Sequence, residues 1–72
     1  MNARSEYVWF IEKDEDWAID QFQDAINESL NRILNDPELL EQEWEKTEIL
    51  RVSFERIGEQ DVAVIRWRII HP

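Results

Sequence analysis

This 72-residue chain contains many carboxylates but few of the other side chains that carry out nucleophilic or acid–base chemistry. It has no Cys and one His, His71, which stands beside Pro72 at the C-terminal end. Nucleophilic catalysis needs an activated Ser, Cys, Thr or Lys with a base within reach, and we expect a frayed chain end not to supply that base. A single Gly cannot build a phosphate-cradling loop. The sequence therefore predicts a protein that is not an enzyme.

Carboxylates are the one reactive group in excess, with 17 Asp and Glu against 8 Lys and Arg and a formal net charge of −9. A glycosidase-type pair of carboxylates needs a cleft, which a domain of this size rarely forms. Asp14, Asp16 and Asp20 could gather a hard cation. However, the twelve-residue calcium loop requires Gly at its sixth position, where Ile19 stands if Asp14 is first. We therefore predict no metal site and no cofactor.

The acids are segregated along the chain and regularly spaced in one part of it. Residues 1–46 hold 13 of the 17 acids and four basic residues, whereas residues 47–72 hold four of each. Within the first part, four acids are spaced by four residues, which places them along one helix face with about 6 Å of rise between neighbours. We call them the acidic row: Asp16, Asp20, Asp24 and Glu28. Like charges at this spacing weaken a helix by about 0.2–0.5 kcal/mol per pair.

Two interpretations of the acidic row stay open. In the first, its spacing is close to that of successive phosphates on a nucleic-acid strand, and it binds the basic surface of a partner protein. In the second, it is a solvated face that aids solubility, favoured by the helix dipole and by an ordinary pair between Glu28 and Arg32. Direct binding of nucleic acid is not expected, because a chain with this net charge repels phosphates.

Hydrophobic periodicity predicts the elements that position these residues. The run 7–12 is aromatic and β-branched, as is typical of a strand. From about 17 to 35, apolar residues recur at intervals of three and four, which predicts an amphipathic helix with Asp14 or Asp16 as its N-cap. Pro fits the first position of a helix, so a short second helix is expected over 37–46.

The remaining sequence predicts a β-hairpin. In 48–56, Leu50, Val52 and Phe54 alternate with polar residues, and a similar alternation continues through 62–70. Gly58 marks the turn. The order β-α-α-β-β predicts one α+β domain over 1–72, in two layers, with a long helix packed on one face of a three-stranded, mostly antiparallel sheet.

Such a sheet has a second face, where Val62, Val64, Arg66 and Arg68 are expected to point away from the helix. The first strand adds either Tyr7, Trp9 and Ile11 or Val8 and Phe10 to that face. Interfaces between proteins are rich in aromatics and Arg, so homodimerisation through this face or through a strand edge is a further hypothesis. Alternatively, the second helix covers this face, or the exposed apolar residues are isolated ones of the kind found on most protein surfaces.

Composition limits the classes of protein to which this chain can belong. With 43% hydrophobic residues and four Trp, the chain is too apolar for a disordered acidic tail, although so short a domain has a thin margin of stability. The N-terminus lacks the pattern of a signal peptide, and no apolar run reaches the length of a membrane span. We therefore expect a cytoplasmic protein without membrane contact.

In size, charge and lack of Cys, the chain resembles phage-encoded inhibitors of host defence, including anti-CRISPR proteins and other nucleic-acid mimics. The resemblance implies a stoichiometric inhibitor or regulator whose acidic row occupies a basic, nucleic-acid-binding surface of a partner protein. The alternative, from a different class, is a non-enzymatic structural or regulatory module that self-associates through its sheet, with its charge serving solubility alone.

Overall fold

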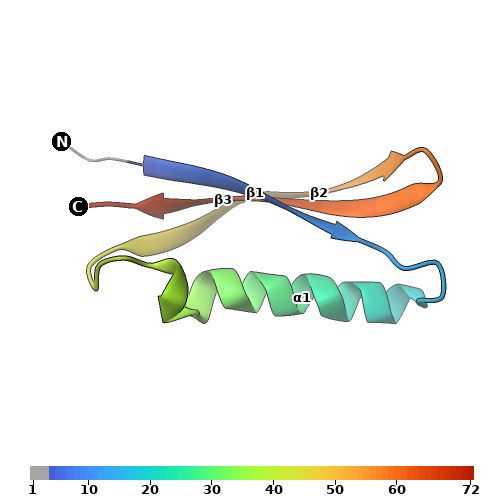
Figure 1. Ribbon diagram of the computed structural model, residues 1–72, viewed down its shortest axis with the longest axis horizontal. Coiled ribbons are helices and arrows are strands. Elements are labelled where there is room, and N and C mark those ends of the chain that lie inside the picture. The colour runs from blue at the N-terminus through green and yellow to red at the C-terminus, as the bar shows by residue number, and fades with distance from the viewer. Residues whose placement is uncertain (1–3) are drawn as a thin grey trace.

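The computed structural model describes residues 4–72, in which one helix lies along one side of a three-stranded antiparallel sheet (Figure 1). The elements are β1 (Arg4–Glu12), α1 (Ile19–Asn35), the 3-10 turn η1 (Pro37–Leu39), β2 (Lys46–Ile57) and β3 (Gln60–Ile70). The strand order is β1-β3-β2, so the C-terminal strand is central and antiparallel to both neighbours. The predicted α+β class and antiparallel sheet are confirmed.

The predicted second helix is wrong. Only the 3-10 turn of η1 forms, and residues 40–45 follow an irregular path into β2. The physical reason is Glu45, which is buried and whose Oε2 accepts hydrogen bonds from the backbone N–H groups of Glu41 and Gln42 at 2.7 and 3.0 Å. Because these donors are bound by a side chain, they are not available to a helical ladder, and the element order is β-α-β-β.

Helix α1 begins two residues later than predicted, and its predicted N-cap is wrong. The N-cap is Ala18, whose backbone N–H donates to Oε1 of Gln21 at 2.8 Å. Asp14 accepts instead from the backbone N–H of Asp16 at 2.9 Å, inside the preceding turn. That local bond stabilises the turn ahead of the helix and leaves Asp16 outside it.

The core lies between α1 and the face of the sheet that is turned toward it. Its buried members are Phe22, Ile26 and Ile33 from α1, and Ala63, Ile65, Trp67 and Ile69 from β3. Trp67 stacks on Tyr7 with ring centroids 4.6 Å apart and meets Trp9 edge-on at 5.2 Å. Tyr7 and Trp9 therefore point toward the helix, and the alternation along β1 leaves Val8 and Phe10 on the outer face of the sheet.

The hairpin joining β2 and β3 closes at the pair Ile57 and Gln60, with two residues between them. Gly58 has φ of 66° and is followed by a residue with negative φ, which matches a type II′ turn. The ladder shifts between Ile49 and Arg51, so Leu50 interrupts the alternation. The predicted alternation of Leu50 with Val52 and Phe54 is therefore broken, and Ile49 packs against the core.

Candidate functional site

The acidic row lies in the turn before α1 and along the exposed surface of that helix. Asp20, Asp24 and Glu28 belong to α1, Asp16 lies in the turn, and all four side chains are exposed. None of them forms an ion pair with any residue that the structure describes. The row is therefore an uncompensated strip of negative charge whose helical part is held on a single rigid element.

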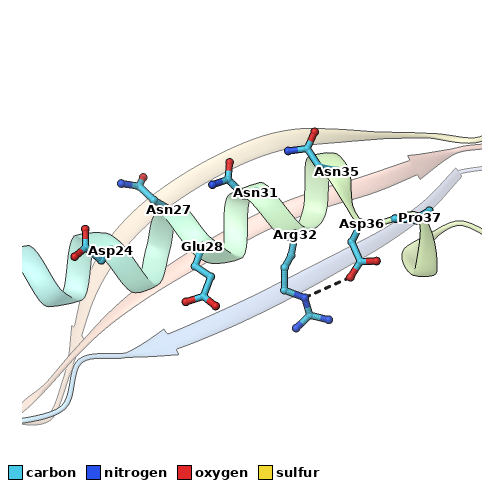
Figure 2. Close-up of a pocket in the computed structure, with 8 residues that line it drawn as sticks. All are labelled: Asp24, Asn27, Glu28, Asn31, Arg32, Asn35, Asp36 and Pro37. Carbon is cyan, nitrogen blue, oxygen red and sulfur yellow. Dashed lines mark ion pairs between the residues drawn. The ribbon is translucent and has the colours of Figure 1, made fainter.

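Arg32 follows the acidic row at the same spacing but does not neutralise it. Its Nε lies 3.6 Å from Oδ2 of Asp36 (Figure 2). Its guanidinium carbon is 5.6 Å from the ring centroid of Trp9 on β1. The pair between Glu28 and Arg32, expected if the row is merely a solvated face, is not among the ion pairs of the described residues. Arg32 instead contacts Asp36 at the end of the helix and the ring of Trp9 on β1.

A second row on α1 consists of Asn27, Asn31 and Asn35, also spaced by four residues and exposed. Figure 2 shows these amides on one side of the helix, with Glu28 and Arg32 pointing to the other. A shallow surface depression of about 640 Å³ lies over this part of the helix and is lined by both sets. Asn is a poor helix former, costing up to about 0.7 kcal/mol relative to Ala. The spacing of four is present in the sequence, but uncharged amides leave no mark in the pattern of charges.

The residues predicted for the sheet face share one face of β3. Val62, Val64, Arg66 and Arg68 alternate with the core residues and therefore lie on the side away from α1. Val62 and Val64 are nevertheless buried, because a central strand is flanked by side chains of both neighbours. Arg68 is engaged with Glu48 of β2, where Nη2 and Oε2 are 2.6 Å apart. Among the four, only Arg66 is exposed.

A third cluster, not predicted from the sequence, joins three segments at the end of the sheet near the C-terminus. Oε1 of Glu45 lies 2.6 Å from Nδ1 of His71, and Nε2 of His71 lies 3.1 Å from Oγ of Ser5. The expectation that His71 lies at a frayed chain end is wrong, because both of its ring nitrogens contact side chains of other segments. The order of contacts, carboxylate to imidazole to hydroxyl, is that of an acid–histidine–serine triad.

The environment of Glu45 favours its ionised form. Burial alone would raise the pKa of Glu45, but the hydrogen bonds it accepts from the Gln42 N–H, from His71 and from the Glu41 N–H outweigh burial and lower this pKa below its ordinary value. None of the main pockets of the described residues is lined by Ser5, Glu45 or His71. The contacts of the cluster tie β1 and the end of β3 to the segment before β2.

Comparison of the chain with protein families, with curated proteins and with solved structures finds no match. Over residues 4–72, no helix has both the length and the apolar character needed to cross a membrane. Within the same range, no three His, Asp or Glu side chains are grouped so as to hold a metal ion.

Proposed function

We propose that this protein is a cytoplasmic, non-enzymatic binding protein whose acidic row occupies a basic, nucleic-acid-binding surface of a partner protein. It acts as a stoichiometric inhibitor or regulator of that partner. The proposal is carried by one observation, that four exposed carboxylates at regular spacing have no ion-pair partner among the described residues. Charge fixed on a rigid element is already arranged for binding and loses little conformational entropy on association.

The position of the basic residues supports this proposal. Arg51 and Arg66 lie on the outer face of the sheet, whereas the acidic row lies on α1 and in the turn before it. The helix and that outer face are on opposite sides of the molecule (Figure 1). These two guanidinium groups therefore leave the acidic row free to attract a basic surface and to speed association with it.

The asparagine row adds hydrogen-bonding groups to α1 on the side of the helix away from Glu28 (Figure 2). Each Asn side chain offers two N–H donors and a carbonyl acceptor. Asn27, Asn31 and Asn35 are exposed, so their low helix propensity is not offset by burial in this chain. A surface that combines acceptors of full negative charge with neutral amides suits a partner rich in Arg and Lys.

The test is capture of the partner from a cell lysate, followed by binding measurements with charge-reversal variants. A triple variant, Asp20→Lys, Asp24→Lys and Glu28→Lys, should abolish binding. The matched control, Glu38→Lys, Glu43→Lys and Glu59→Lys, changes net charge equally at exposed positions outside the row and should retain most of the affinity.

Two further readouts test the mode of binding. Affinity should fall steeply between about 50 and 200 mM salt, and nucleic acid should compete for the partner. If binding is indifferent to salt and equally affected by the two triple variants, the acidic row is not the binding surface. Circular dichroism of both variants separates loss of binding from loss of fold.

A second candidate function is self-association through the outer face of the sheet. It is favoured by Phe10, which lies on that face with 63% of its surface exposed. An apolar ring of this size in water is unfavourable, and a partner that covers it would remove the cost.

A further inference from the structure

The outer face of the sheet carries its side chains in cross-strand rows, and Phe10 stands in one of them. The ladder places Phe10 of β1 and Ser53 of β2 on either side of Val64 in β3. We call these three residues the phenylalanine row. No described segment covers this face, whereas α1 lies along the opposite one (Figure 1). The exposed ring of Phe10 therefore stands on an open surface.

Charges of opposite sign flank the phenylalanine row at equal distances. On one side Glu12 and Glu55 lie across Val62 from each other, and we call this pair the glutamate row. On the other side Arg51 and Arg66 are direct cross-strand partners, and we call them the arginine row. Each row is two residues from the centre, which is about 7 Å along the strands.

Neither charged row is compensated within the described chain. All four side chains are exposed, and none forms an ion pair with a described residue. Like charges placed directly opposite each other destabilise a sheet, so the contact between Arg51 and Arg66 is unfavourable in an isolated copy. A surface that supplies carboxylates to the arginine row and cations to the glutamate row would compensate the charge of both rows.

We infer that this surface is the same face of a second copy of the chain, related by a two-fold axis that crosses the strands at the phenylalanine row. Rotation about this axis reverses the strand direction, so the glutamate row of each copy lies over the arginine row of the other. Glu55 then faces Arg51 of the second copy, because both belong to β2, and Glu12 lies beside its Arg66. Phe10 packs on Phe10 at the centre.

The charges also exclude the other simple arrangement. A two-fold axis along the strands would place β1 of one copy over β2 of the other. Glu12 would then face Glu55, and Arg66 would face itself, so like charges would meet at both charged rows. Aligned sheets pack with their strands within about 30° of each other, which keeps the three central rows superposed in the favourable arrangement.

The area of the face suits a weak dimer. The 11 residues of β3 extend about 36 Å, and three strands about 4.8 Å apart make the face about 14 Å wide, so two copies bury roughly 1,000 Å² in all. This is near the lower limit for specific interfaces, so we expect dissociation in the micromolar range. The inference rests on the second candidate function, self-association through the sheet, and is independent of the proposed inhibitor role, since the acidic row stays exposed on both copies.

The decisive experiment exchanges the two charged rows. One variant carries Glu12→Arg and Glu55→Arg, and a second carries Arg51→Glu and Arg66→Glu. Each variant alone opposes like charges, so sedimentation equilibrium should show its dimer dissociation constant raised at least about tenfold over the unmodified chain. An equimolar mixture restores opposite charges at every contact, and it should form a heterodimer within about threefold of the original affinity.

A second pair of variants tests the centre of the interface. Phe10→Asp should give a monomer, whereas Leu34→Asp, at an exposed apolar position on α1, should leave the dimer intact. The inference is overturned if the unmodified chain is a monomer at several hundred micromolar, if the dimer survives Phe10→Asp, or if the charge-exchanged mixture fails to associate while both variants remain folded. A dimer that survives all these changes would instead be formed by strand pairing at a sheet edge.

Discussion

His71 and Glu45, 26 residues apart in the chain, are joined by a contact of 2.6 Å between Nδ1 and Oε1. Since Nε2 of the same ring lies 3.1 Å from Oγ of Ser5, one side chain links the end of β3 to β1 and to the segment before β2. Glu45 in turn holds the backbone of that segment in its irregular path. The last residues of the chain thus fasten the connection between the helix and the sheet.

Acid should weaken the fold through Glu45. Burial opposes its charge, but hydrogen bonds from the Gln42 N–H, from His71 and from the Glu41 N–H lower its pKa in the folded state below the ordinary 4.5. A carboxyl group of this kind stabilises the fold above its unfolded pKa, and the stabilisation is lost as pH falls through the lowered folded pKa. Urea unfolding should therefore show the unmodified chain more stable than Glu45→Gln near neutral pH, with the difference shrinking below about pH 4.5. A difference that does not change with pH would contradict this account.

Shortening a core side chain should lower the free energy of unfolding far more than shortening an exposed neighbour. Ile33 and Ile65 have no exposed surface, so changing either to Ala removes buried methyl groups and leaves a cavity. We expect the free energy of unfolding to fall by about 2–5 kcal/mol in each case. The control is Leu34→Ala, one residue from Ile33 and 54% exposed, which should change it by less than about 0.5 kcal/mol. Denaturant titration distinguishes the two outcomes.

Substitution of Gly58 should destabilise the turn, and the cause is backbone conformation alone. Its φ is 66°, and a Cβ built there meets no atom within 4 Å. Gly58→Ala should therefore destabilise the fold by about 1–2 kcal/mol, without any steric clash. Gly58→Asn should cost less, because Asn tolerates positive φ better than Ala. Equal losses for the two variants in thermal melting would argue against a conformational origin.

Removing one charge from the middle of the acidic row should stabilise the protein and weaken partner binding together. Asp24 lies four residues from both Asp20 and Glu28, and each such pair costs about 0.2–0.5 kcal/mol. Asp24→Asn, which hardly alters helix propensity, should raise the free energy of unfolding by about 0.4–1 kcal/mol. Glu59→Gln removes an exposed charge outside the row and should do neither. A destabilised Asp24→Asn would show that the row does not repel itself.

Local patterns in the sequence were enough to predict most of the regular structure. The apolar spacing of three and four residues locates α1, and its C-terminal end at Asn35 agrees with the structure. The alternation in β3 correctly separates Ile65 and Trp67, which face the helix, from Val64 and Arg66, which do not. These features depend on neighbouring residues only, which is why one sequence suffices to find them.

The errors and omissions depend on contacts between distant segments. The second helix was predicted from Pro37, but the buried carboxylate of Glu45 holds the backbone in another path, and its position depends on His71. The insertion of Leu50 follows from pairing with β3 and has no signature in β2 itself. The acidic row is predicted by spacing, whereas the pairing of Arg32 with Asp36 in place of Glu28 emerges only in three dimensions.

The strand order has a consequence for synthesis of the chain. β3 leaves the ribosome after β1 and β2, yet each of those strands pairs with β3. The nascent chain can form helical turns early, but the hydrogen bonds of the sheet must wait until its middle strand has emerged. Folding of the sheet is therefore delayed until β3 has been synthesised, and a stop codon near Gln60 would remove the centre of the sheet and not its border.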